Sequence, residues 1–365
     1  MNLLTEKISR LYAAYLLPCV CSSMVTGIYT IVDMIAVGRY EGPGGTAALA
    51  VMSPMWILLC CAGLLFGIGG SVLLSNDRGM GLNGNTWFSS SLIGLVVVVG
   101  IIWVIVGIFD EQMLRFFGAN DEILPLASAY LDIIKYCIPL YPLCTWLSAF
   151  LRNDGNPNLA AVGVLAGGLF NIFGDVYFTF TLDMGIRGAA LASVLGQVIA
   201  VAIQLAHFVG KRNKLRFVRT THFIDDMRQI CAVGFPSFII DVSLGSLGVF
   251  FNNRIMGLMG PVGLAVYGVA NNMMLGLQYA AYGISNAAQP IFSANHGARN
   301  HERVMQTFKM GMKICGLFGI ASALLCMLTP ETIIRIFMTP TQAVLEMAPA
   351  ALRVYFLSFA LLFAN

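Results

Sequence analysis

Long apolar runs separated by short polar segments dominate the chain. Ten such runs lie at 11–37, 46–74, 87–109, 123–150, 157–180, 186–209, 229–256, 262–293, 306–328 and 341–365. Each reaches the roughly 20 residues that a helix needs to cross a bilayer. They lack the alternation of barrel strands, and a helix pairs its own backbone groups in lipid. The pattern therefore predicts an all-α polytopic membrane protein.

Composition supports this class. Hydrophobic residues make up 58% of the 365 residues and charged residues 11%, whereas soluble domains carry about 25% charge. A soluble protein of this composition would expose apolar patches that aggregate. Membrane lipid is therefore the expected surrounding. We expect no nucleic-acid partner, and a monomer.

The two halves of the chain share a spaced pattern. Gly42-Pro43-Gly44-Gly45 returns 218 residues later as Gly260-Pro261-Val262-Gly263, and Pro18 returns as Pro236. At an offset of 220, Glu111, Arg115 and Phe117 correspond to Glu331, Arg335 and Phe337. The order of these matches indicates duplication, which in transporters places a site between two repeats.

The repeat predicts two parallel lobes. Residues 1–210 form a first lobe of six helices, 211–228 a basic linker, and 229–365 a second lobe of four helices. Two helices corresponding to 157–209 have no counterpart in the second half. We therefore expect the second lobe to be incomplete and the sequence to be truncated.

Basic residues predict the orientation. Most of the 21 Lys and Arg residues, including the run from Lys211 to Arg219, fall on the side of the N-terminus. The positive-inside rule then places the N-terminus in the cytoplasm. We expect the protein to lie in the cell's inner (plasma) membrane. The basic run is interpreted as a linker and topology signal, with anionic-lipid binding as the alternative.

Cysteine and histidine do not form a catalytic or metal-binding pattern. The nine cysteines fall mostly inside the apolar runs, as small core residues do. The histidines lie at or beyond the ends of the runs, at His207, His222, His296 and His301. No Ser/His/Asp set can be assembled at one depth. We expect no cofactor and no enzymatic activity.

Polar residues inside the first-lobe runs form the strongest candidate site. Asp33 lies late in the first run, Asn171 and Asp175 are four residues apart in the fifth, and Ser193 and Gln197 in the sixth. Residues four apart share one helical face. Charge inside a membrane is costly, and two nearby carboxyls titrate as a unit. We expect a proton or sodium site here, with hydrogen bonding to neighbouring helices as the alternative.

Further polar, Met and aromatic residues could line a substrate cavity. Candidates are Asp241, Gln278, Met273 and Tyr282, together with Gln197 from the first lobe. The eighth run carries a polar stripe of Asn271, Asn272, Gln278, Asn286 and Gln289. Interhelical hydrogen bonds explain the polar stripe equally well, and ordinary packing is the favoured role of the Met and aromatic residues. Asp132 and Lys135 lie near one helical face and are expected to form an internal pair.

Several motifs together resemble the multidrug and toxic compound extrusion (MATE) family, in its DinF-like prokaryotic branch. They are Pro18 with Ile31-Val32-Asp33 and Val37-Gly38, Leu114–Gly118, Arg152-Asn153-Asp154-Gly155-Asn156-Pro157, Asn171-x3-Asp175, and Gly185-Ile186-Arg187-Gly188-Ala189-Ala190-Leu191-Ala192-Ser193. Their order and spacing extend from about residue 10 to the end of the chain.

The resemblance implies a twelve-helix exporter of two six-helix lobes. It implies exchange of cytoplasmic organic cations or drugs for external sodium ions or protons. It places ion coupling on Asp33, Asn171 and Asp175, with Ser193 where that branch often has Thr. This sequence departs from another branch of the family, which carries a Glu after the proline of the seventh helix. Gly245 occupies the position of that Glu, so we do not expect a site that depends on it.

Two other functions stay open as alternatives. A lipid-linked saccharide flippase shares this architecture, but its cavity usually carries more Arg and Lys than these runs contain. A membrane-bound enzyme would need the histidine arrangement that is missing.

Overall fold

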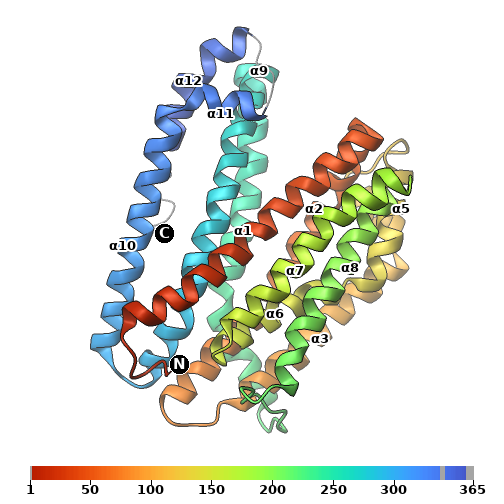
Figure 1. Cartoon of the computed structure of the whole chain (residues 1–365). Helices are drawn as coiled ribbons and strands as arrows, with labels where there is room; N and C mark the ends of the chain where they lie inside the picture. The colour runs from red at the N-terminus through yellow and green to blue at the C-terminus, as the bar shows by residue number, and fades with distance from the viewer. Residues whose placement is uncertain (1, 338–341, 359–365) are drawn as a thin grey trace.

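The computed structural model describes the backbone of residues 2–337 and 342–358 and most of their side chains. Every regular element in these residues is a helix (Figure 1). The side chain of Asp241, an expected cavity residue, lies outside the described residues.

The first half of the chain folds into a bundle of helices. Its elements are α1 (Ile8–Glu41), α2 (Pro43–Gly79), α3 (Asn85–Ile108), α4 (Asp110–Phe116), α5 (Leu124–Ile134), η1 (Lys135–Cys137), α6 (Leu140–Asn153), α7 (Pro157–Val176), η2 (Tyr177–Thr181), α8 (Ile186–Leu205) and η3 (Ala206–Val209). Gly42 ends α1 with a φ of 70°, a conformation that glycine adopts without steric cost. Pro43 then opens α2, where its missing N–H is not needed.

The run at 123–150, expected as one helix, is broken. The helices α5 and α6 meet at 47°. Pro139 lacks the N–H that would bond the carbonyl of Lys135. The indole N–H of Trp103 donates to that carbonyl instead, at 2.6 Å. The break thus follows from a proline, and α3 satisfies the carbonyl that it frees.

The second half contains α9 (Phe223–Gly297), α10 (His301–Leu328), α11 (Pro330–Phe337) and α12 (Gln342–Phe356). The segment α9 doubles back, because Ile230 lies against Gly69 and Ala294 against Gly79, only ten residues apart on α2. A straight helix would separate Ile230 from Ala294 by about 96 Å. Figure 1 shows its two arms side by side. The arms contain the expected runs 229–256 and 262–293.

Two short helices explain the matches at offset 220. Glu111 and Arg115 lie in α4, and Glu331 and Arg335 lie in α11. In α4, Arg115 donates to Glu111 at 2.9 Å. The sequence showed the repeat here but did not predict these helices.

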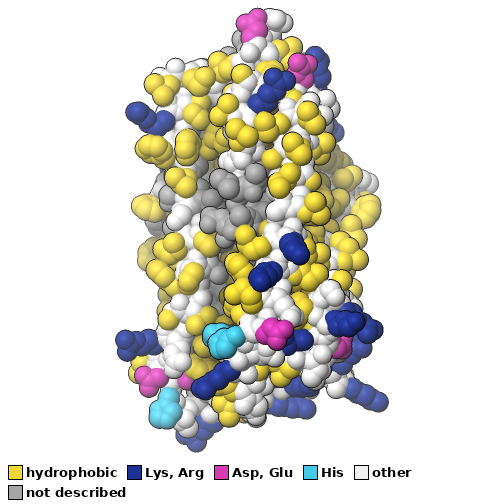
Figure 2. All heavy atoms as spheres, turned by 90° about the vertical axis from the view of Figure 1, so that its left-hand side faces the viewer, with side chains coloured by type: hydrophobic (Ala, Val, Ile, Leu, Met, Phe, Trp, Pro, Cys, Tyr) yellow, Lys and Arg dark blue, Asp and Glu magenta, His cyan; other side chains and the backbone are white. Residues whose placement is uncertain are grey.

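The described residues include six helices long and apolar enough to cross a membrane, or seven when α5 and α6 count as one span. Figure 2 shows apolar side chains over the middle of one face and most charged side chains toward its two ends. This distribution matches a bilayer with water on both sides.

The two halves join near the N-terminal end of α1. The Tyr12 hydroxyl donates to the carbonyl of Ile284 at 3.1 Å, and Gln289 donates to Ser71 at 3.3 Å. Figure 1 shows the halves closest together at this end and separating toward the other.

Candidate ion-binding site

Glycine contacts hold the helices of the candidate site close together. A Cβ on Gly196 of α8 would lie 2.7 Å from the carbonyl oxygen of Gly167 on α7. Gly168 of α7 likewise faces Val25 of α1. Small residues allow membrane helices to approach this closely. Asn171, one turn after Gly167, and Ser193, one turn before Gly196, are therefore brought within hydrogen-bonding distance.

Asn171 connects the polar groups of α7 and α8. Its amide nitrogen donates to Ser193 Oγ at 3.0 Å and to Asp175 Oδ1 at 3.4 Å. Asn171 is 3% exposed and Asp175 is fully buried. Three of the four residues predicted to bind the coupling ion thus form one cluster.

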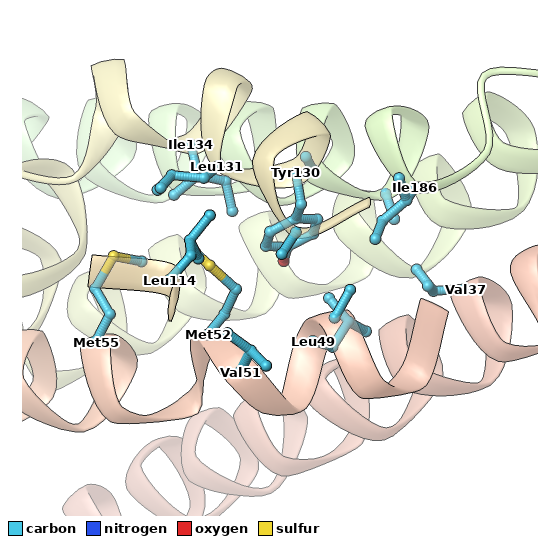
Figure 3. Close-up of a cluster of buried hydrophobic side chains, with 14 of the residues drawn as sticks. Val37, Leu49, Val51, Met52, Met55, Leu114, Tyr130, Leu131, Ile134 and Ile186 are labelled. Atoms are coloured by element: carbon cyan, nitrogen blue, oxygen red, sulfur yellow. The ribbon is translucent and has the colours of Figure 1, made fainter. Parts of the chain in front are cut away.

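Asp33 is the fourth predicted residue, and it approaches the cluster from α1. Tyr29, one turn before Asp33, packs on Gly168 of α7, one turn before Asn171. The hydroxyl of Tyr130 on α5 donates to Asp33 Oδ2 at 3.3 Å. Figure 3 shows Tyr130 packed among apolar side chains that include Leu49, Met52 and Leu131. These contacts place the two carboxyls in one site.

Tyr130 was missed by the sequence analysis. An aromatic residue in an apolar run gives no periodic polar signal, and packing is its usual role. The only available cue was its hydroxyl, since buried Tyr hydroxyls usually find a polar partner.

Several oxygens in this cluster are buried and have no partner among the described residues. They are Asp33 Oδ1, Asn171 Oδ1 and Asp175 Oδ2. Buried polar atoms are normally paired, so such a group requires an explanation. Carboxylate and amide oxygens are ligands for hard cations, and a carboxyl can instead take a proton. No group of three His, Cys, Asp or Glu suited to a metal occurs in the described part of the chain.

Two of the candidate cavity residues, Gln278 and Tyr282, contact each other. The amide of Gln278 donates to the Tyr282 hydroxyl one turn away at 2.7 Å. Met273 packs with Val269 and Tyr355 in a second-half apolar cluster. Gln197 Oε1 is buried and has no partner among the described atoms. Tyr279, which follows Gln278 in α9, packs on Gly27 of α1.

Asn286 of the stripe in α9 makes an interhelical contact, and Asp132 of α5 makes a local contact with Lys135 of η1. Asn286 accepts a hydrogen bond from Arg152 at 3.4 Å. Lys135 pairs with Asp132 at 2.7 Å, as the sequence predicts. Asp132 is more than half exposed, so this pair lies at the surface and is not internal as expected.

A second polar network lies around Asp154, just beyond α6. Asp154 accepts from Arg78 at 2.6 Å and from the Lys214 backbone N–H at 2.9 Å, and His207 Nε2 lies 2.7 Å away. Burial disfavours the charged carboxylate. The bonds with His207 and Lys214 and the charge of Arg78 outweigh burial and hold the pKa of Asp154 below its ordinary value. This network attaches the basic linker to the first half.

The fold and cluster define a polytopic helical membrane protein with two carboxyls held between its helices. The chain belongs to the MatE family, whose profile matches residues 18–177 and 237–365. This confirms the resemblance at the level of the family. The DinF-like branch stays a prediction.

Curated relatives include proteins named multidrug export protein MepA. The protein from Staphylococcus saprophyticus is 29% identical over 284 residues, covering 76% of this chain and 62% of that protein. The chain thus spans less than two thirds of this relative. A protein from Staphylococcus aureus is 24% identical over 344 residues, covering 93% of this chain and 75% of that protein.

Solved structures show the same fold. A MATE in complex with MaL6 aligns with a TM-score of 0.90 at 23% identity, covering 99% of this chain and 82% of that chain. A multidrug resistance MATE transporter in an outward-facing conformation aligns with a TM-score of 0.86 at 23% identity, covering 99% and 81%.

Proposed function

We propose that this chain exports organic cations or drugs from the cytoplasm in exchange for external sodium ions or protons. The observation that carries this proposal is the set of buried, unpartnered oxygens on Asp33, Asn171 and Asp175. Such a set costs free energy unless a cation or proton occupies it. The naming of relatives as multidrug export proteins supports the cargo class.

The proposed mechanism is alternating access between two lobes. Cargo enters from the cytoplasm while Asp33 and Asp175 are not both neutralised. The lobes then separate on the outer side, and an external ion binds the carboxyls. Its binding changes the contacts of α1 with α5 and α7, because Asp33 is held by Tyr130 and Tyr29 of the same helix packs on α7. Cargo then leaves, and with the carboxyls neutralised the two lobes return to the state that is open toward the cytoplasm.

We also propose a cytoplasmic N-terminus and an inner (plasma) membrane location. Basic side chains are most numerous at the lower end of Figure 2, the end where the N-terminus lies in Figure 1. The positive-inside rule assigns that end to the cytoplasm. Contacts such as Ser71 with Gln289 join the halves at this end. The structure therefore fits a state closed toward the cytoplasm.

Transport in proteoliposomes tests the proposal. The chain is reconstituted, and export of a fluorescent organic cation is followed under a sodium gradient and, separately, a proton gradient. We expect Asp33→Asn and Asp175→Asn to reduce gradient-driven export at least tenfold, because neither variant can carry the charge that the ion neutralises. Wild-type rates in either variant would refute the assignment.

Asp121→Asn is the matched control. Asp121 is 90% exposed and pairs with Arg115 at the surface, so this variant should export at the wild-type rate. Equal losses in all three variants would show that the assay reports general damage and not ion coupling.

A further inference from the structure

Arg152 has a charge that no described residue neutralises. It lies in α6, one residue before that helix ends. In the sequence, Arg152 was noted only as part of the motif Arg152–Pro157. Its side chain reaches α9 and meets Asn286, a neutral amide, at 3.4 Å. Its Nε–H is buried and has no acceptor among the described atoms.

The carboxylate nearest in sequence cannot serve Arg152. Asp154 already binds Arg78, the Lys214 N–H and His207. None of the ion pairs in the described part of the chain includes Arg152. Guanidinium presents five donors in a planar fork, and here a single long bond to an amide uses one of them.

The surroundings hold Arg152 at the junction of the two halves. The Tyr15 hydroxyl of α1 donates to the Arg152 carbonyl at 3.3 Å. Cys19 of α1 is also close to its charge. Gly283 of α9 packs directly on Val20. The guanidinium therefore lies where α1, α6 and α9 meet, while Arg152 and Asn286 both stay partly exposed.

An uncompensated charge in such a place is costly, and an anion is the partner that removes the cost. A carboxylate fits the planar fork with two parallel hydrogen bonds. We infer that Arg152 is a specificity-determining residue that binds the carboxylate of an amphiphilic, zwitterionic cargo molecule. The inference rests on the proposed function, since it names a class of cargo for that exporter.

This subsite is separate from the ion site. Cys19 and Asp33 are 14 residues apart on α1, which corresponds to about 21 Å along a helix. A change at Arg152 should therefore alter cargo preference and leave the response to ions in place. An experiment can therefore distinguish failure of this inference from failure of the proposed ion coupling.

Equilibrium binding tests the inference without a gradient. The full chain in detergent is titrated against two dyes, a rhodamine with a free carboxylate and its methyl ester, and fluorescence polarisation gives both dissociation constants. A charge-assisted bond to carboxylate predicts about tenfold tighter binding of the acid than of the ester. Equal binding of the two dyes to the wild type would overturn the inference.

Two variants at the subsite and one control sharpen the test. Arg152→Gln should remove the preference by weakening the acid alone. Asn286→Asp places a carboxylate beside the guanidinium and should also weaken only the acid, so it decides the question if Arg152→Gln does not fold. Arg115→Gln, at an exposed arginine, should retain the tenfold preference. Equal weakening of both dyes in Arg152→Gln, or an undiminished preference in Asn286→Asp, would overturn the inference.

Discussion

The hydroxyl of Tyr130 lies 3.3 Å from Oδ2 of Asp33 and joins α5 to α1 inside the first half. The other oxygen of Asp33 is buried and has no partner among the described residues. Tyr130 thus fixes the direction of the carboxyl and leaves one oxygen for an ion. Tyr130 is therefore a positioning residue for the proposed site, and its hydroxyl also occupies an oxygen that a cation can bind.

Tyr130→Phe should leave the fold intact and change ion binding. The ring keeps its apolar packing, and the loss of one hydrogen bond costs about 1 kcal/mol. The donor no longer competes with a cation for Oδ2, so the coupling ion should bind about fivefold more tightly. The half-saturating ion concentration for export measures this. Unchanged or weaker ion binding would show that the hydroxyl does not compete with the ion.

Gly196→Ala should disrupt the contact between α7 and α8. The added Cβ would lie 2.7 Å from the Gly167 carbonyl and 3.3 Å from the Asn171 Cβ, so the helices must separate. We expect a loss of about 1–3 kcal/mol in stability and weaker ion binding. Gly100→Ala in α3 is the control, because nothing lies within 4 Å of its added Cβ. Equal unfolding temperatures for the two variants would contradict this packing account.

The Asp154 network should make stability depend on acid pH. The folded-state pKa of Asp154 is below its ordinary value, so its stabilising effect is present above the unfolded pKa of about 3.9. It is lost as pH falls through the folded pKa.

Asp154→Asn should therefore lower the unfolding temperature at pH 6, where removing one partner of a buried pair costs about 3 kcal/mol. The difference from wild type should shrink below about pH 4. Thermal unfolding in detergent, measured from about pH 3 to about pH 7, tests this dependence. A difference that is constant across this range would assign the stability to another group.

The sequence predicted the fold class and the family because both depend on long patterns. Apolar length identifies membrane helices, and Asn171 and Asp175 share a face by simple helical periodicity. The family match confirms the resemblance. The number of helices, the lobe boundaries and the roles of the site residues stay predictions.

Features that depend on side-chain reach were not predictable. Tyr130 contacts Asp33 across 97 positions of sequence, and Arg152 extends from the end of α6 to Asn286 of α9. A run of residues predicts where a helix ends but not which neighbouring helix a long side chain meets. Local chemistry was more informative at Pro139, where the break in the expected span follows from a missing N–H.

The central claim is that Asp33 and Asp175 bind the coupling ion in exchange for cargo. Its most direct test is the equilibrium affinity of the wild type for a fluorescent organic cation, measured while sodium concentration and pH are varied separately. Linkage requires that the ion weaken cargo binding as the cargo weakens ion binding. We predict that added sodium or lower pH weakens binding to the wild type, whereas Asp33→Asn and Asp175→Asn do not respond. A wild type that ignores both ions, or variants that respond as it does, would contradict the account.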